Sequence, residues 1–153
     1  TATLRGEWKF VALRDYERML TAMEIPSMMQ SMVTSQFNGQ CKRLLFEGGE
    51  LRAAWGAPPE YEDEEPRPLL AGSPVGTAGF QVECKEPQIF TFVSPDDGGV
   101  REIRTMPQSS KMYVEQIYET LRGATILCIR ERAMRAHDHS EFATARRYYK
   151  RIS

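Results

Sequence analysis

The residues best suited to chemistry in this 153-residue chain lie in its final segment, where a single position separates Arg147 from Tyr149. Residues 142–152 read FATARRYYKRI and are expected to form a β-strand. Both side chains then point to the same face, together with Ala143, Ala145 and Arg151. If that face is a barrel interior, the buried guanidinium needs an anion. A guanidinium fork matches a carboxylate, and a phenol adds a donor. The pattern therefore predicts a site for the carboxylate of an apolar ligand, with the small alanines leaving room for an alkyl chain.

The rest of this candidate ligand site is less sharply defined. A shift of one residue in strand register would turn Arg146 and Tyr148 inward in place of Arg147 and Tyr149. The other expected ligand contacts come from the preceding strand, the first strand and two helices: Arg130, Arg132, Trp8, Met23 and Met28.

No other pattern indicates a reaction or a metal site. His137 and His139 flank Asp138, but this set of ligands is incomplete, so an exposed turn is expected there. HExxH, glycine-rich phosphate loops and nucleophile elbows are absent from the sequence. The tyrosines near arginines do not match RNA-binding motifs. We therefore expect no enzyme activity, no metal, no cofactor and no nucleic-acid partner.

Residues 4–33 must build the part of the fold that positions this site. They begin as a strand, because one face is formed by alternate residues: Leu4, Gly6, Trp8, Phe10 and Ala12. A glycine inside a strand indicates a sharp bend or the close approach of another segment. We therefore expect such an approach at Gly6.

From Asp15 the apolar period becomes helical. Tyr16, Met19, Leu20 and Met23 form one stripe. Asp15 is the expected N-cap, and Ile25 before Pro26 ends the helix. A second helix should start at Ser27, which forms a capping box with Gln30. Its apolar side is formed by Met28, Met29, Met32 and Val33. The methionines of the two helices, Met19, Met23, Met28, Met29 and Met32, are either the core of a helical lid or an adaptable surface against a lipid tail, a membrane or a protein.

A strand, two short helices and then only strands resemble the intracellular fatty-acid-binding proteins of the calycin superfamily. The match consists of the Gly6-x-Trp8 start and the helices DYERML and IPSMMQSMV. The resemblance implies that the helix pair caps one mouth of a β-barrel and that a gap beside it admits the ligand. It also implies that Arg147 and Tyr149 form the carboxylate-binding motif of the last strand.

Two further points follow from the resemblance. The family has another arginine on the strand two before the last, where this chain offers Gln116 or Glu115. In calycins generally, a late arginine can stack over the indole of the Gly-x-Trp motif and close the barrel base, which is a structural cation–π contact. For Arg147, ligand binding and this structural role therefore both remain open.

The remaining chain is expected to be strands only. The resulting fold is mainly β, an up-and-down antiparallel barrel of nine or ten strands in one domain, residues 1–153. A proline-rich acidic insertion at residues 57–77 carries Glu62, Asp63, Glu64 and Glu65. The expected strands are 40–46, 50–55, 78–84, 88–93, 100–105, 111–119, 124–134 and 142–152, with Gly48 and Gly49 as the first hairpin turn.

Composition limits the kinds of binding partner and the cellular compartment that we expect for this protein. The chain has 20 basic and 21 acidic residues, but they are unevenly distributed. Residues 1–100 contain 9 basic and 15 acidic residues, whereas residues 101–153 contain 11 basic and 6 acidic residues. This distribution is a mild indication of a basic patch. Three widely spaced cysteines without a paired pattern indicate reduced thiols in a reducing compartment. No transmembrane run or signal peptide is visible. The missing initiator methionine leads us to expect a processed or trimmed N-terminus.

Two functions of different class fit these features. The first is non-enzymatic binding of a fatty acid or similar apolar anion inside the barrel. The second is an accessory or scaffold subunit of a larger complex, in the cytoplasm or the mitochondrion. Its protein partners would meet the acidic insertion and the basic C-terminal strand.

Overall fold

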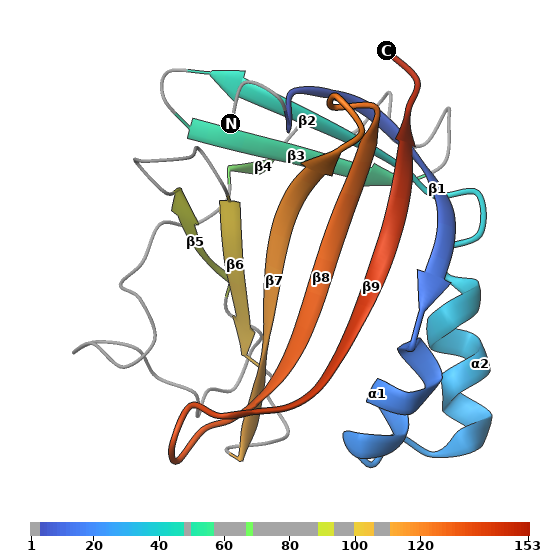
Figure 1. The fold of residues 1–153 in the computed structure, drawn as a ribbon, viewed down its shortest axis with the longest axis vertical. Helices are drawn as coiled ribbons and strands as arrows, with labels where there is room; N and C mark the ends of the chain where they lie inside the picture. Colours follow the sequence, from blue (N-terminus) through green and yellow to red (C-terminus); the bar gives the residue numbers. More distant parts are fainter. Residues whose placement is uncertain (1–3, 48–49, 57–66, 69–88, 94–99, 106–110) are drawn as a thin grey trace.

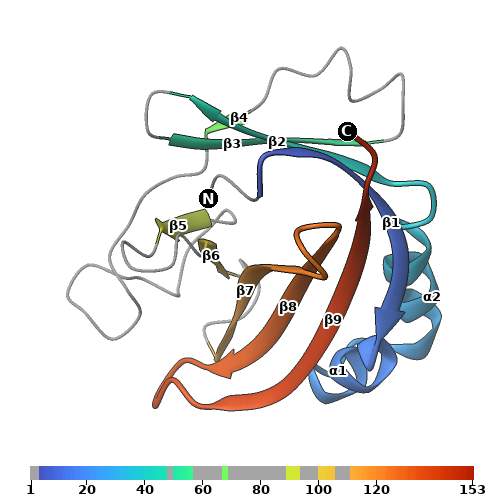
Figure 2. The ribbon, with the colours of Figure 1, turned by 45° about the horizontal axis from the view of Figure 1, so that its top comes forward.

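The computed structural model describes residues 4–47, 50–56, 67–68, 89–93, 100–105 and 111–153. They form one curled antiparallel sheet with two short helices beside one end of it (Figure 1; Figure 2). In chain order the elements are β1 (Gly6–Arg14), α1 (Tyr16–Ala22), α2 (Ser27–Ser35), β2 (Cys41–Glu47), β3 (Glu50–Gly56), β4 (Arg67–Pro68), β5 (Ile89–Val93), β6 (Val100–Thr105), β7 (Met112–Leu121), β8 (Ile126–Arg135) and β9 (Glu141–Arg151).

The strands run up and down across the sheet in the order β4-β3-β2-β1-β9-β8-β7-β6-β5. The last strand, β9, therefore lies against the first, β1, with Trp8 opposite Arg151 and Phe10 opposite Tyr149. The mainly β class, the antiparallel pairing and the helix pair after the first strand are confirmed. Closure into a barrel of nine or ten strands stays a prediction, because residues 69–88 lie outside the described residues.

Only two residues of the insertion 57–77 are described. Arg67–Pro68 forms the short strand β4, which pairs with β3. The acidic run 62–65 lies outside the described residues, as do the turns expected at 48–49 and 94–99. The single-domain organisation and the acidic insertion therefore stay predictions.

The alternation of β1 holds through its first half. Trp8 is fully buried and Lys9 is exposed. A β-bulge between Phe10 and Ala12 then shifts the pairing with β9 by one residue. A bulge inserts one unpaired residue and reverses the faces beyond it. The prediction that Ala12 shares the face of Trp8 is therefore wrong: Ala12 is exposed and Leu13 is half-buried.

Gly6 is the close-approach point that the sequence predicted. Its φ of +140° lies in the region that favours glycine. A Cβ at this position would lie 2.7 Å from the carbonyl oxygen of Ser153 and would collide with the Arg151 guanidinium. The C-terminus of the chain therefore packs against β1 only because residue 6 has no side chain.

Helix α1 buries the predicted stripe of Tyr16, Met19, Leu20 and Met23. The cap chemistry differs from the prediction. Asp15 occupies the N-cap with φ 57°, and its carboxylate makes no capping hydrogen bond. The helix ends at Ala22, because Glu24 turns left-handed with φ 62° before Pro26 is reached.

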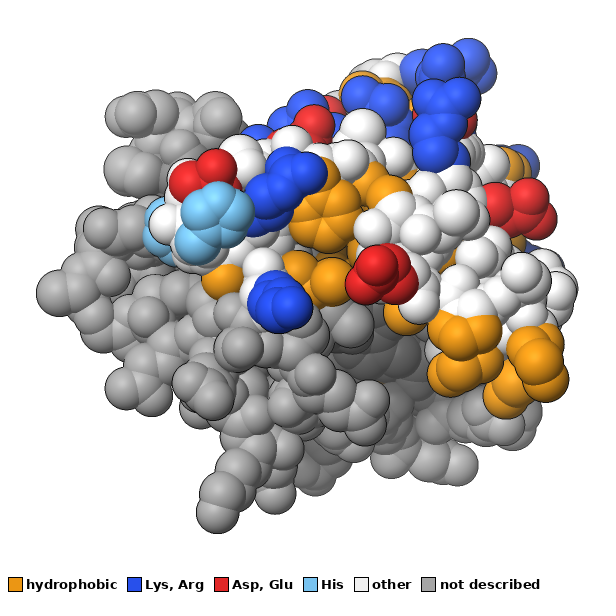
Figure 3. Space-filling view, turned by 90° about the horizontal axis from the view of Figure 1, so that it is seen from below, with side chains coloured by type: hydrophobic (Ala, Val, Ile, Leu, Met, Phe, Trp, Pro, Cys, Tyr) orange, Lys and Arg blue, Asp and Glu red, His pale blue; other side chains and the backbone are white. Residues whose placement is uncertain are grey.

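Helix α2 buries none of its side chains, so the lid-core interpretation of its methionines is wrong. Met28, Met29 and Met32 are 83%, 51% and 66% exposed. In Figure 3, which shows the molecule from below, apolar side chains are visible at the surface. The predicted capping box does not form, because the N-cap is Pro26. Instead, the Gln30 amide donates to the Ile25 carbonyl at 2.9 Å and so ties α2 to the end of α1.

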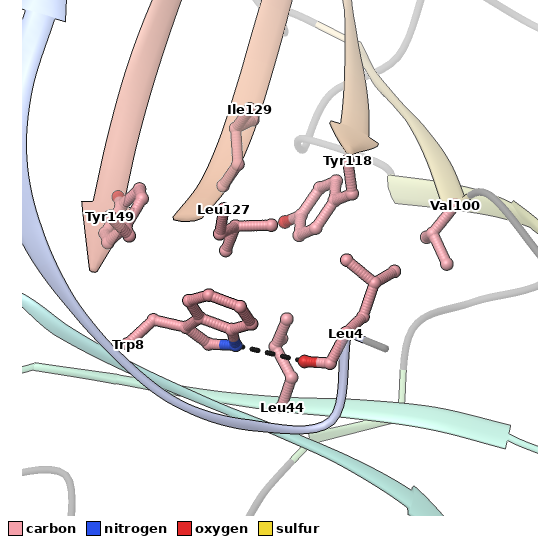
Figure 4. Close-up of a cluster of buried hydrophobic side chains, with 8 residues drawn as sticks. All are labelled: Leu4, Trp8, Leu44, Val100, Tyr118, Leu127, Ile129 and Tyr149. Atoms are coloured by element: carbon pink, nitrogen blue, oxygen red, sulfur yellow. Dashed lines mark hydrogen bonds between the residues drawn. The ribbon is translucent and has the colours of Figure 1, made fainter. Parts of the chain in front are cut away.

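The core consists of two apolar clusters. The first, which we call the Trp8 cluster, contains Leu4, Trp8, Leu44, Val100, Tyr118, Leu127, Ile129 and Tyr149 (Figure 4). The second, the helix cluster, lies beneath α1 and contains Tyr16, Met19, Leu20, Met23, Phe37, Val114, Ala133 and Ala145. Among the described residues, no helix combines the length and the apolar character that a membrane crossing requires.

Candidate ligand-binding site

The inner face of the sheet carries a row of polar side chains between the two apolar clusters. On adjacent strands, Gln116 of β7 lies opposite Glu131 of β8, which lies opposite Ala145 of β9. Arg147, two residues further along β9, shares this face and is 4% exposed. Tyr149 is fully buried on the same face. The strand register is therefore the one that directs Arg147 and Tyr149 inward.

Arg147 is already paired with a carboxylate of the protein. Its Nη1 forms a salt bridge with Oε1 of Glu131, and both side chains are nearly fully buried. The Gln116 amide donates to the same oxygen at 3.0 Å, and the Tyr16 hydroxyl donates to Oε2 at 2.8 Å. The Arg147 guanidinium also lies 4.8 Å from the centre of the Phe37 ring. We call Tyr16, Gln116, Glu131 and Arg147 the inner network.

Burial and charge act together on this network. Burial, the largest single influence, lowers the pKa of the Arg147 guanidinium, but Glu131 together with Tyr149, Tyr16 and Tyr118 outweighs it and raises that pKa. Burial, reinforced by Glu131, also raises the pKa of Tyr16, which holds the phenol in its donating form. The inner network therefore contains an ion pair formed within the protein, and a hydrogen bond from Tyr16 connects its carboxylate to helix α1.

Three atoms of the inner network are buried without a hydrogen-bond partner among the described residues. They are Nε and Nη2 of Arg147 and Oε1 of Gln116. Unsatisfied buried polar atoms are rare and cost free energy, so each one needs an explanation. Two donors and one acceptor around the same glutamate are groups that a ligand head group or an ordered water can satisfy.

Tyr149 shares the face of Arg147, as predicted, but its hydroxyl has another partner. It donates to Oε1 of Gln40 at 2.6 Å, and its ring meets the ring of Phe10 edge-on at 5.8 Å. Burial raises the pKa of Tyr149, and the nearby Arg147 partly offsets this rise. The phenol therefore stays neutral beside the guanidinium.

A second buried polar group lies near the Trp8 cluster and was missed from the sequence. The Lys42 ammonium contacts the Tyr118 hydroxyl, which donates to Oε1 of Glu102 at 2.6 Å. Lys42 and Glu102 are both fully buried. Lysine and glutamate side chains are almost always exposed, so the composition did not indicate that Lys42 and Glu102 would be buried. The position of Lys42 directly opposite Trp8 in the register is the pattern that could have found it.

Trp8 and its arginine form the structural contact expected for calycins, but with a different partner. The indole is fully buried and donates to the carbonyl of Leu4 at 3.0 Å (Figure 4). The guanidinium that covers it belongs to Arg151, 4.1 Å from the ring centre. The structural role left open for Arg147 therefore belongs to Arg151.

The other predicted ligand contacts divide between the two faces. Met23 is buried in the helix cluster, whereas Met28 is exposed on α2. Arg130 and Arg132 lie on the outer face of β8, because they alternate with the inward Glu131. The structure therefore brings Arg147, Tyr149, Trp8 and Met23 to the interior and leaves Arg130, Arg132 and Met28 outside it.

The two alternatives for the missing family arginine also separate by face. Gln116 points inward, into the inner network. Glu115 points outward, where it lies 3.4 Å from Arg132 and 3.8 Å from Arg101. The amide of Gln116 thus stands where the resemblance led us to look for a cation.

The histidines and cysteines show no metal or redox site within the described residues. His137 and His139 are exposed, and Nδ1 of His139 lies 3.1 Å from the Tyr113 hydroxyl. The described part of the chain contains no group of three potential metal ligands. Cys41 and Cys128 are free and buried, and burial raises the pKa of both thiols, which keeps them unreactive.

An open hollow of about 440 Å³ lies where α1 begins. Its lining includes Leu13, Tyr16 and Thr34. Tyr16 therefore borders this hollow and also reaches inward to Glu131. It is the described residue that connects the outer surface beside the helices to the inner network.

Solved structures of lipid-binding proteins resemble the chain over almost its whole length. A Schistosoma mansoni fatty acid binding protein in complex with arachidonic acid matches with a TM-score of 0.65 at 11% identity, covering 99% of this chain and 98% of that one. Apo lipid binding protein 8 of Caenorhabditis elegans matches with a TM-score of 0.61 at 9% identity, covering 99% and 96%. The zebrafish ileal bile acid-binding protein complexed with cholic acid matches with a TM-score of 0.57 at 13% identity, covering 98% and 99%.

No protein-family model and no curated protein sequence matches the chain. Identities this low establish the fold and nothing finer. The chain adopts a fold like that of these fatty-acid-binding proteins, as the resemblance in its sequence predicted.

Proposed function

We propose that this chain binds a fatty acid or a similar amphipathic lipid inside the curled sheet, without catalysing a reaction. The observation that carries the proposal is the state of Arg147. Its side chain is 4% exposed, yet Nε and Nη2 have no partner among the described residues. A head-group oxygen placed there would accept hydrogen bonds from a cation, which are stronger than neutral ones.

The apolar clusters on either side of the inner network supply the surface for a tail. The Trp8 cluster and the helix cluster both border this polar row, and Ala145 in the second adds little bulk beside Glu131. Burial of the tail would provide most of the affinity, at roughly 25 cal/mol per Å² of apolar surface.

Entry requires side chains to move, because the described interior residues pack closely against one another. Tyr16 is the natural gate. It borders the surface hollow, and its only contact with the interior carboxylate is one hydrogen bond of 2.8 Å to Glu131. Breaking that bond would release the Tyr16 hydroxyl from the inner network beside the surface hollow.

The experiment measures lipid binding directly. The purified protein is extracted and any bound lipid is identified by mass spectrometry. Displacement of the neutral dye Nile red by added lipids then gives affinities. The variant Arg147→Gln should bind about ten- to a hundredfold more weakly, because a hydrogen bond to a charged group is lost.

Arg146→Gln is the matched control, because Arg146 is the neighbouring residue on the outer face of the same strand and is half-buried there. Arg147→Lys keeps the charge beside Glu131 and checks that the fold survives, by circular dichroism. Equal binding by Arg147→Gln and Arg146→Gln would refute the assigned site. Absence of any lipid binding by the wild-type chain would refute the function.

The described residues add no support to the scaffold-subunit alternative, because the acidic insertion that was expected to contact protein partners lies outside them. It stays a prediction, and so do the protein partners and the mitochondrial location.

A further inference from the structure

The inner face carries two positive and two negative side chains that are almost completely buried among the described residues. Arg147 is paired with Glu131, and Lys42 is linked to Glu102 through the hydroxyl of Tyr118. Each of these four charged residues is at most 4% exposed. Their charges cancel. A buried charge is costly unless an opposite charge accompanies it, and among the described residues these two positive side chains are already matched by the two negative ones, so they leave no excess positive charge for an entering anion.

We propose that Glu131 is a resident counter-ion that sets head-group selectivity, so that the site takes a lipid with an uncharged, hydroxyl-bearing head group in preference to a carboxylate. This inference rests on the proposed function and narrows its ligand class.

Glu131 already places a carboxylate beside the guanidinium that would receive the ligand head group. One of its oxygens receives Arg147 and Gln116, and the other receives Tyr16. A fatty-acid carboxylate at Arg147 would therefore lie beside a second carboxylate. Like charges in one site oppose each other's ionisation. One nitrogen of the guanidinium, Nη1, is therefore already occupied by a carboxylate of the protein.

The unpartnered atoms favour a group that both donates and accepts. Nε and Nη2 of Arg147 offer hydrogens, whereas Oε1 of Gln116 offers lone pairs. The two side chains contact the same oxygen of Glu131, so both lie beside one carboxylate. A hydroxyl can accept from Arg147 and donate to Gln116, but an ionised carboxylate only accepts. A carboxylate would leave the Gln116 oxygen unsatisfied and would add a charge.

The test compares two lipids that differ only in the head group, dodecanol and dodecanoate. Affinities are measured by displacement of Nile red, a neutral probe, at about pH 8, where a free carboxyl of ordinary pKa is ionised. The wild-type chain should bind dodecanol about tenfold or more tightly than dodecanoate.

Glu131→Gln is the decisive variant. The glutamine keeps an oxygen for Arg147 and Gln116, and its amide faces the Tyr16 hydroxyl, which can also accept. The variant removes only the negative charge. Arg147 then lacks a counter-ion, so dodecanoate should gain about ten- to a hundredfold relative to dodecanol.

Two further variants separate charge selection from a structural role. Glu141→Gln makes the same chemical change at an exposed carboxylate, 2.7 Å from Arg132, and should leave the selectivity unchanged. The double variant of Glu131→Gln with Arg147→Gln removes both charges, and the gained preference for dodecanoate should disappear. Thermal unfolding by circular dichroism confirms that each variant is folded.

The outcomes distinguish this inference from the proposed function. A wild-type chain that prefers dodecanoate, or a preference that Glu131→Gln does not change, would overturn the role of Glu131 and leave lipid binding standing. If neither lipid displaces the probe from any folded variant, both proposals fail. The expected reversal, absent from Glu141→Gln and cancelled in the double variant, supports the counter-ion.

Discussion

The guanidinium of Arg151 lies 4.1 Å from the centre of the Trp8 indole ring and joins the last strand of the sheet to the first. It also donates to the carbonyl of Arg5 at 2.6 Å and to that of Ala124 at 2.8 Å. One side chain therefore binds the start of β1, the turn before β8 and the indole that anchors the Trp8 cluster.

Replacing Arg151 with alanine should lower the free energy of unfolding by about 2–3 kcal/mol, because a cation–π contact and charged hydrogen bonds are lost together. Urea unfolding followed by tryptophan fluorescence measures the change. Lys150→Ala is the control, since Lys150 is exposed on the same strand and its removal should change stability by less than about 0.5 kcal/mol. Equal effects from the two variants would show that the stacked arginine does not stabilise the fold.

Gly6→Ala should be more destabilising than Gly39→Ala, although both glycines have positive φ. At Gly39, with φ +74°, a Cβ would meet nothing within 4 Å, so only backbone strain of about 1 kcal/mol is expected. At Gly6 the Cβ would also lie 2.7 Å from the Ser153 carbonyl oxygen and would displace Arg151. The difference in urea midpoint between the two variants measures the cost of this close approach. A smaller loss at Gly6 than at Gly39 would contradict it.

Stability should fall steeply in alkali. Burial raises the pKa of Tyr16, Tyr118 and Tyr149, and it raises that of Tyr113 to about 12. Because the folded pKa exceeds the unfolded value, the contribution of each phenol is complete below about pH 10 and is lost as the pH rises, since the unfolded chain releases the proton first. Each tyrosine that stays protonated should lower the unfolding free energy by about 1.4 kcal/mol per pH unit above that point.

Urea unfolding at increasing pH, with phenolate absorbance as a second readout, checks the alkaline prediction. Absorbance from these four phenols should appear together with unfolding. Tyr16→Phe removes one of these phenols, so the unfolding free energy should fall less steeply with rising pH, by the contribution of one tyrosine. Ionisation of the phenols in a chain that remains folded would show that they are not protected.

Methionine oxidation should follow exposure. Met28, Met29 and Met32 on α2 are more than half exposed, whereas Met19 and Met23 are buried in the helix cluster. Dilute hydrogen peroxide should therefore convert the α2 methionines to sulfoxides first, as peptide mass spectrometry would show. Earlier oxidation of Met19 or Met23 would mean that α1 does not rest on the sheet as described.

The sequence was sufficient for the faces of the elements. A strand has a period of two and a helix a period of 3.6, so local patterns alone determine which side chains share a face. This is why Arg147 and Tyr149 were correctly placed on one face and why the stripe on α1 was found, whereas the register that turns this face inward was left open. The pattern of β1 misled only at the bulge after Phe10, because a single inserted residue leaves no reliable sign in the composition.

The partners across those faces were decided by the tertiary structure. Glu131 meets Arg147 because strand register brings residues on β8 and β9 together, and Arg151 covers Trp8 because β9 pairs with β1. Periodicity indicates which side chains share a face, but it does not identify the residues that they contact. The chain by itself therefore determined the order of strands and helices and the face that Arg147 shares with Tyr149, and only the long-range pairing of strands decided that this face points inward and that Arg147 meets Glu131 there.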